Sequence, residues 1–396
     1  MDRRNFLKQS SLASSLLFVP SFIRAFDALP INAIGFKRLV VVQLTGGNDG
    51  LNTLVPFNND LYYKNRPTIA IPKNEVLSIT DDLGLHASLA PLQRLYDAGL
   101  LTIINNVGYP NPNRSHFRAM DIWQTGSSAE QTLQTGWLGR YLDHIGQKPY
   151  NALEIDDSLS LALKGHNMNG IAVKSPYVLY KTSQDPFFKN VLRHYNDEHL
   201  NEHNLGYLYK TMISAESSAK YIFEKHKMSS NSNSYPNNEF AGQLKTAARL
   251  INSGIDTKVF YTALNGFDTH ANQKNSQSRL LKTYAESIET FVMDLKKEGT
   301  LNDTLILTFS EFGRRVKQNA AHGTDHGAAS NVFIIGNQLK TPGVYNDLAS
   351  LSNLDDNGDL KYTVDFRAIY ATILNKWLGA SDSEILFNNF DKLNFI

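Results

Sequence analysis

The sequence predicts an α/β fold in which helices cover both faces of a mostly parallel central sheet. The run Phe36–Leu44 is almost uniformly apolar and has strand length, which is typical of a strand buried on both faces of a parallel sheet. From residue 241 onward, segments of strand length alternate with amphipathic helical segments, a rhythm that indicates a helix-covered sheet. The chain of 396 residues, 42% of them hydrophobic, is long enough to bury a substantial core.

Local patterns predict the elements in chain order. Apolar runs of strand length predict strands at Phe36–Leu44, Leu101–Val107, Ser158–Lys164, Gly170–Val173, Lys258–Leu264, Thr304–Phe309 and Asn331–Ile335. Apolar residues at helical spacing predict helices at Leu89–Leu100, Ser115–Trp123, Gly136–Ile145, Ala241–Ile251, Leu280–Lys297 and Asp365–Leu378. Lys189–Lys227 is expected to be mostly helical. Residues 176–240 are expected to elaborate a single domain that spans residues 36–396.

The amino terminus predicts an export signal over residues 1–25. Paired arginines at positions 3 and 4 precede a short apolar region, Gln9–Phe22, and a small residue, Ala25, at the expected cleavage point. The apolar region is too short to cross a membrane. The pattern Arg-Arg-x-Phe-Leu-Lys resembles a twin-arginine signal, and the alternative is a frayed basic terminus. We therefore expect a periplasmic or secreted protein that uses the twin-arginine export machinery and has no stable membrane anchor.

Charge and cysteine content exclude several functional classes. The 39 basic residues nearly balance the 38 acidic ones, so the net charge of +1 predicts neither a nucleic-acid partner nor a membrane-surface partner. The chain contains no cysteine. Disulfides, thiolate metal ligands and a cysteine nucleophile are therefore excluded.

The segment after the first predicted strand, Thr45–Asn52, is a glycine-rich turn. Its glycine spacing is not that of a dinucleotide-binding loop, and Pro56 follows instead of a clear helix. The turn either delivers Asp49 to the carboxyl edge of the sheet or is only a favourable turn sequence.

Ser115 stands at the start of a predicted helix, after the rigid loop Pro110–Arg114. As an N-cap it would satisfy a free backbone amide, whereas as a nucleophile it would lie where the helix terminus also favours an anion. His116 and Asp121 are either metal ligands or part of an ordinary polar helix face.

Polar residues gather where the later strands end. Asp268 and His270 follow one strand, Glu311 and Arg314 follow the next, and His322, Asp325 and His326 precede another. Because ligands bind at the carboxyl edge of such sheets, we expect these groups to meet there. Carboxylates with imidazoles suit zinc or manganese better than calcium. Arg314 would stabilise a developing anion.

Three rival interpretations account for less of the sequence. A Ser-His-Asp hydrolase would use Ser115 or Ser310, but neither lies in a G-x-S-x-G elbow. A glycan- or peptide-binding module would explain the 18 Tyr and 21 Phe, but not the carboxylate–histidine cluster. The segment Asp355–Asp359 lacks the later glutamate of a calcium loop and is expected to be a solvated turn.

From Arg3 to Gly379 the chain resembles the twin-arginine-exported bacterial family known as domain of unknown function 1501. The motifs that carry the resemblance are VQLTGGNDGLNT (42–53), NRSHFRAMDIWQTG (113–126), GFDTHANQ (266–273), SEFGRR (310–315), GTDHG (323–327) and Tyr362–Arg367. That family is similar to the alkaline phosphatase and sulfatase superfamily. The resemblance implies a three-layer α/β/α, alkaline phosphatase-like fold with a two-metal hydrolytic site.

The resemblance also implies roles for individual residues. Asp49 matches a metal-binding acid, Ser115 the nucleophile at a helix start, and His326 the last histidine ligand. Asp268 and His270 resemble an acid–histidine ligand pair, and Asp325 with His326 is a second candidate pair. Glu311 and Phe312 depart from the superfamily's Ser-Asp-His-Gly, which leaves a one-metal or a degenerate site as alternatives.

The sequence thus predicts an exported hydrolase of phosphate or sulfate esters that acts on a small anionic ester and uses one or two divalent metal ions. Its expected metal ligands are Asp49, Asp268, His270, Glu311, Asp325 and His326, and its expected catalytic residues are Ser115 and Arg314. The alternative is a non-catalytic extracytoplasmic protein that keeps the fold for binding or assembly.

Overall fold

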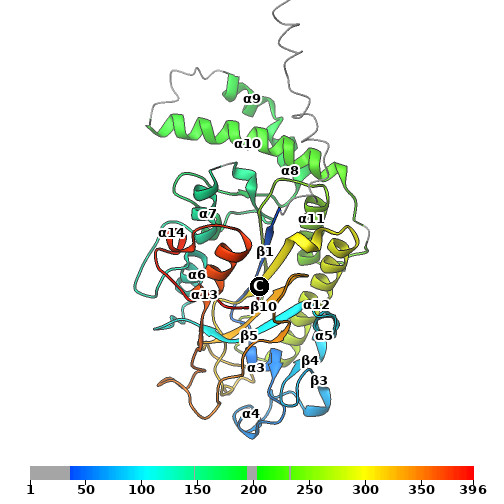
Figure 1. Ribbon diagram of the computed structural model, residues 1–396, viewed down its shortest axis with the longest axis vertical. Coiled ribbons are helices and arrows are strands. Elements are labelled where there is room, and N and C mark those ends of the chain that lie inside the picture. The colour runs from blue at the N-terminus through cyan, green and yellow to red at the C-terminus, as the bar shows by residue number, and fades with distance from the viewer. Residues whose placement is uncertain (1–35, 147, 194–202, 232) are drawn as a thin grey trace, which may run out of the picture. The chain divides into compact units, whose positions relative to one another are not determined.

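A mixed nine-stranded sheet forms the centre of the computed structural model (Figure 1). The structure describes residues 36–146, 148–193, 203–231 and 233–396, and residues 37–396 form one compact unit. The predicted export signal lies outside the described residues. Within them, the strand order is β11-β5-β10-β9-β1-β8-β6-β7, and β12 also pairs with β5.

The central strand β1 (Arg38–Thr45) confirms the prediction of a strand buried on both faces. It pairs in parallel with β8 (Val259–Asn265) on one side and with β9 (Thr304–Phe309) on the other. Val40 and Val42 belong to one hydrophobic cluster, whereas Leu39 and Val41 belong to a second cluster on the opposite face. Since successive side chains of a strand point to opposite faces, each face of β1 has its own core.

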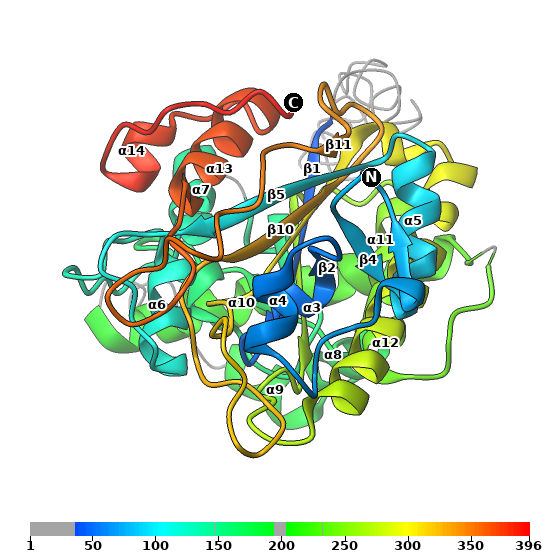
Figure 2. The same cartoon turned by 90° about the horizontal axis from the view of Figure 1, so that it is seen from below.

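Helices cover both faces and confirm the three-layer α/β/α architecture (Figure 2). The first cluster includes side chains of α5 (Ala90–Asp97), α11 (Glu239–Asn252) and α12 (Gln273–Lys297). The second includes side chains of four helices, namely α6 (His116–Thr125), α7 (Trp137–Ile145), α13 (Phe366–Thr372) and α14 (Asp382–Leu386).

One strand reverses direction within the sheet. β10 (Ser330–Ile335) is antiparallel to both β9 and β5 (Leu101–Gly108). The chain therefore enters β10 at the sheet edge where β1, β8 and β9 end. This places residues 322–329 at the same edge as three strand ends that carry polar residues.

The remaining elements are short or peripheral. The short strands of the main sheet are β6 (Ala152–Glu154), β7 (Ile171–Ala172), β11 (Gly343–Val344) and β12 (Val364–Asp365). A second sheet contains β2 (Leu54–Val55), β4 (Gly84–His86) and β3 (Val76–Ser78). The other α-helices are α3 (Gly50–Thr53), α4 (Asp60–Asn65), α8 (Pro176–Ser183), α9 (Pro186–Arg193) and α10 (His203–Met228). Short 3-10 turns are η2 (Lys73–Glu75), η3 (Ala87–Leu89), η4 (Pro149–Asn151), η5 (Leu161–Leu163) and η7 (Thr300–Asp303).

Two predicted elements need correction. The strand expected at Ser158–Lys164 is wrong, because this segment forms the 3-10 turn η5 and lies across the start of α7. There the backbone N–H of Gly136 donates to the carbonyl of Lys164 at 2.8 Å. The helix expected at Asp365–Leu378 is interrupted, since α13 passes into a π-helical turn, η8 (Ile373–Trp377).

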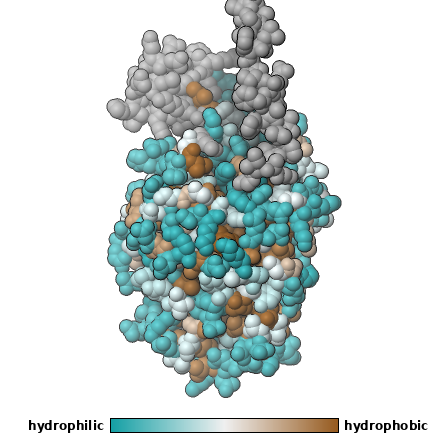
Figure 3. All heavy atoms as spheres, in the orientation of Figure 1, coloured by the Kyte–Doolittle hydropathy of each residue, from teal (hydrophilic) through white to brown (hydrophobic). Residues whose placement is uncertain are grey.

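The face drawn in Figure 3 is mostly hydrophilic, with smaller apolar areas between the polar side chains. Among the helices that the structure describes, none combines the length and the apolar character needed to cross a membrane.

A buried carboxyl group in β6 generates a prediction about the pH dependence of stability. Burial raises the pKa of Glu154 to about 7, against roughly 4.3 for an unfolded glutamate. Between these values the unfolded chain loses a proton that the folded chain keeps, so stability should fall as pH rises from about 4 to about 7. Relative to Glu154→Gln, the wild type should lose on the order of 3 kcal/mol over this range, measured by urea unfolding at both pH values. Parallel curves for the two proteins would contradict this assignment.

Candidate metal centre

Four segments that are far apart in the sequence meet at the carboxyl edge of the sheet. They are the loop after β1, the loop after β8, the loop that runs from β9 into β10, and the amino terminus of α6. The segments after β9 and before β10 pair directly through a bridge between Arg314 and His326. The sequence prediction that polar groups after separate strands lie together is thus met for several of the residues.

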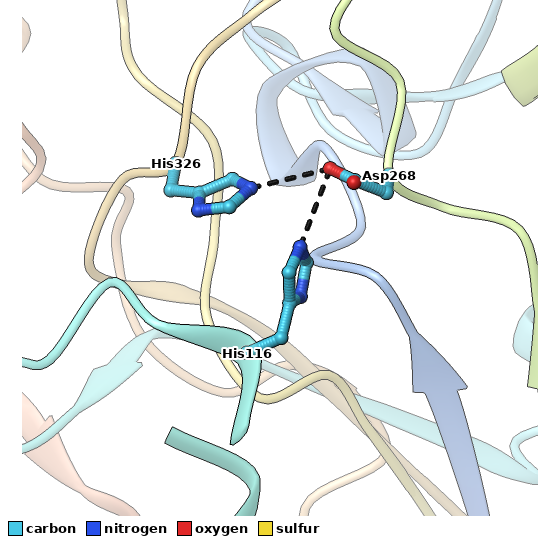
Figure 4. Close-up of side chains that lie close together, drawn as sticks. All are labelled: His116, Asp268 and His326. Atoms are coloured by element: carbon cyan, nitrogen blue, oxygen red, sulfur yellow. Dashed lines mark hydrogen bonds and ion pairs between the residues drawn. The ribbon is translucent and has the colours of Figure 1, made fainter. Parts of the chain in front are cut away.

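The centre of the site is a group of three side chains, His116, Asp268 and His326 (Figure 4). Their potential ligand atoms all lie within 4.8 Å of one another. Asp268 Oδ1 is 3.2 Å from His326 Nε2 and 3.4 Å from His116 Nε2. Two imidazole nitrogens and one carboxylate oxygen match the donor set of a zinc site.

The Nδ1 atom of His116 and the Nδ1 atom of His326 each contact an oxygen acceptor. His116 Nδ1 lies 3.0 Å from Glu311 Oε1, and this buried carboxylate also accepts a bond of 2.7 Å from the Gly46 N–H. His326 Nδ1 lies 2.7 Å from the backbone carbonyl of Arg114. Because a carboxylate and a carbonyl only accept, both rings carry their proton on Nδ1, and a neutral ring presents a bare Nε2 to Asp268. Such outer contacts orient the histidine ligands of metal sites.

The charges around the cluster follow from its contacts. Burial raises the pKa of Asp268, but the hydrogen bond from Arg314 and the contact with the His326 ring outweigh it and hold that pKa at about 2. The hydrogen bond to Glu311 raises the pKa of His116, whereas burial lowers the pKa of His326. Asp268 is therefore an anion over the physiological range, and the two histidines differ in basicity.

His270 and Asp325 flank the three central residues. His270 Nε2 lies 3.0 Å from Asp268 Oδ1 and 2.9 Å from His326 Nε2. Its Nδ1 lies 3.3 Å from Asp325 Oδ1, which also accepts a bond of 3.2 Å from the Asn319 amide. Both side chains are about half exposed, so they form the solvent side of the centre.

Arg314 is buried behind Asp268. Its guanidinium donates to Asp268 Oδ1 at 2.7 Å, to the Gly47 carbonyl at 2.8 Å and to the Thr324 carbonyl at 2.8 Å. The carbonyls of Gly46 and Phe267 also accept from it. These contacts turn the buried guanidinium away from solvent and toward Asp268.

The structure does not bring Asp49 into the cluster. Asp49 caps α3 by accepting from the Leu51 N–H at 3.1 Å. Its second oxygen forms a fully buried ion pair of 2.6 Å with Arg66 and also accepts from Gln273. The α3 turn directs the carboxylate back against Arg66.

Ser115 occupies the N-cap position of α6, but its hydroxyl makes no cap hydrogen bond. The residue is exposed, and its backbone N–H donates to Asn113 at 2.9 Å. It stands between Arg114, whose carbonyl holds His326, and His116. The sequence left His116 open as a ligand or a polar surface residue, and the structure places it in the centre. Asp121, five positions further along α6, is outside the cluster.

The fold and the site define a class: a three-layer α/β/α protein with a candidate metal centre at the carboxyl edge of its sheet. Within this class, the chain belongs to the family described as protein of unknown function DUF1501, whose model matches residues 36–393. This confirms the family predicted from the sequence motifs. No curated protein matches the sequence significantly.

Solved structures show distant similarity. The lipoteichoic acid synthase LtaP from Listeria monocytogenes is 12% identical with a TM-score of 0.37, and the match covers 80% of this chain and 69% of that one. The periplasmic domain of EcEptC from Escherichia coli, in complex with Zn, is 11% identical with a TM-score of 0.37 and coverages of 77% and 74%. The PsFucS1 sulfatase from Pseudoalteromonas sp. is 14% identical with a TM-score of 0.40 and coverages of 98% and 74%.

The contacts of Arg314 predict a large loss of stability on substitution. Arg314→Lys keeps the charge but cannot reach three loops at once, so several buried carbonyls and Asp268 lose their donors. We expect a loss on the order of 3 kcal/mol in the free energy of unfolding, measured with urea. The neighbouring Arg315→Lys is the control, because that side chain is 40% exposed, and it should change stability by less than about 1 kcal/mol. Equal effects of the two substitutions would show that Arg314 does not join the loops.

Proposed function

We propose that this chain is an exported, metal-dependent hydrolase of phosphate or sulfate esters. One observation carries the proposal: the Nε2 atoms of His116 and His326 both face Asp268 Oδ1, at 3.4 and 3.2 Å. Both Nδ1 atoms are directed at acceptors, so the neutral rings and Asp268 present only lone pairs to one another. His116 Nε2 is buried and makes no hydrogen bond within the part of the chain that is described.

A divalent cation satisfies all three groups at once. Facing acceptors separated by 3.2 to 3.4 Å repel one another unless a proton or a cation lies between them. Burial lowers the pKa of His326, which disfavours the proton at that ring. Nitrogen and oxygen donors of this kind favour zinc or manganese. A second ion would use His270 and Asp325 at the solvent side.

A bound cation would polarise an ester oxygen and help to ionise a nearby hydroxyl. We assign the nucleophile to Ser115, because this exposed residue immediately precedes His116 and its hydroxyl makes no cap bond. The first N–H groups of α6 are then free to bind the oxygens of a tetrahedral anion. Glu311 and the Arg114 carbonyl orient the two histidine ligands, and Arg314 orients Asp268.

Export is the second part of the proposal and rests on the predicted twin-arginine signal at residues 1–25. A protein exported by that route crosses the membrane already folded. A centre built from loops of several strands needs the folded chain to bind its ion. Loading before export would therefore agree with this choice of route.

Metal content tests the centre directly. Purified protein should retain at least one divalent ion per chain by elemental analysis, and His116→Gln or His326→Gln should reduce this to a small fraction because each removes one of three central ligands. The matched control is His322→Gln, since this exposed histidine lies on the same loop but contacts Thr68. Metal-free wild-type protein that also fails to take up Zn²⁺ would favour the non-catalytic binding or assembly protein.

Two serine substitutions separate catalysis from capping. Ser115→Ala should lower the turnover of aryl phosphates or aryl sulfates at least about a thousandfold. It should leave stability unchanged, because the hydroxyl makes no cap bond. Ser175→Ala is the control: Ser175 accepts from the Val178 N–H at the start of α8, so its loss should cost about 1 kcal/mol without changing turnover. Unchanged turnover in Ser115→Ala would remove this residue from the nucleophile role.

A further inference from the structure

Asp359 is a buried acid in a segment that the sequence predicts to be a solvated turn. That prediction holds for Asp356 and Asn357, which are exposed, but it is wrong for Asp359, whose side chain is 0% exposed. Asp355 closes the turn by accepting from the Asn357 and Asp359 N–H groups at 2.9 and 2.8 Å. The turn thus directs one carboxylate into the protein.

The turn has a rigid base. Leu351 and Leu360 on either side of it are buried in a third hydrophobic cluster, together with Leu51 and Phe57 from the segment after β1. An antiparallel bridge also joins Leu354 to Leu360. Asp359 is therefore held by packing and hydrogen bonds that do not depend on its own charge.

The partner of Asp359 is Arg114. Asp359 Oδ2 accepts from Arg114 Nε at 2.9 Å and also from Arg114 Nη2. Asp355 Oδ2 lies 3.6 Å from the same guanidinium, and Arg315 Nε lies 3.9 Å from Asp359 Oδ1. With its side chain fixed in this way, Arg114 is anchored to the turn although it belongs to the irregular loop before α6.

The backbone of Arg114 is part of the candidate centre. Its carbonyl lies 2.7 Å from His326 Nδ1 and sets the position of the proton on that ring. The next two residues are Ser115 and His116. A displacement of Arg114 would therefore release His326 and would move the start of α6 away from the cluster.

We propose that Asp359 is a positioning residue for the candidate metal centre. Through the Arg114 side chain, it fixes the carbonyl that keeps the His326 proton on Nδ1 and leaves Nε2 free to bind the cation. This inference rests on the proposed function, because it assumes that the cluster binds a metal ion. The side chain of Asp359 contacts Arg114 and not the three residues of the cluster, so its effect would be transmitted through Arg114.

The test compares Asp359→Asn with Asp382→Asn in the full chain. Asp382 is a matched control, because its side chain is 7% exposed and pairs with Lys392 at 2.6 Å. Both substitutions remove a buried charge and should lower the melting temperature. Only Asp359→Asn should weaken Zn²⁺ binding in competition titrations, by about three- to tenfold, as expected when an outer contact of a ligand is lost. An affinity within about twofold of wild type would overturn the proposal.

A second variant and a proton resonance measurement cover the two remaining outcomes. If Asp359→Asn does not fold, Arg114→Lys serves instead, because it keeps the charge and the carbonyl but loses the paired contact; it must also weaken Zn²⁺ binding. If the wild type binds no Zn²⁺, the proposed function fails. The positioning role is then judged by the His326 Nδ1–H proton resonance, assigned by its absence in His326→Gln. Loss of that resonance in Asp359→Asn supports the inference, and its persistence overturns it.

Discussion

The site depends on one buried cation, the guanidinium of Arg314, which joins the loops after three strands. Each of these loops turns its carbonyl oxygens inward, and Arg314 supplies the donors that those buried oxygens require. The close approach needs a glycine at position 46, where φ is +116° and a Cβ atom would lie 2.4 Å from the Asp268 nitrogen. Two features of the sequence, one arginine and one glycine, therefore determine where Asp268 stands.

The direction of β10 is the second condition for this geometry. A uniformly parallel sheet would need a long crossover to bring the chain back after β9, and the next loop would then come from a helix. Here residues 310–329 contain no helix and lead into an antiparallel strand, so the segment from Arg314 to His326 stays at one edge. The bridge between these two residues keeps the last histidine within 3.2 Å of Asp268. The antiparallel direction of β10 therefore also places His326 beside Asp268.

The sequence predicts those features that local pattern determines. The apolar runs of β1 and β9 gave their strands to within about two residues, because burial on both faces leaves little choice of residue type. The placement of Asp268, His270 and His326 near one another followed from the strand ends. The position of Asp49 could not be predicted, since it depends on Arg66 seventeen residues later. The contact between His116 and Glu311 joins residues that are 195 positions apart. The sequence pattern around His116 and the pattern around Glu311 therefore could not predict it.

The charge balance of the centre also follows from the contacts. Arg314 offsets the charge of Asp268, but Glu311 is completely buried and its partners within the described chain are His116, the Gly46 N–H and the Ser310 hydroxyl. A buried carboxylate without a cation is costly, so the balance requires a positive charge at His116. A proton on His116 Nε2 supplies it in acid. In the proposed metal centre, a cation bound to that nitrogen would supply this charge near neutral pH, and it would also satisfy His326 and Asp268. In the proposed metal centre, Glu311 would be an outer acid that makes His116 a stronger ligand.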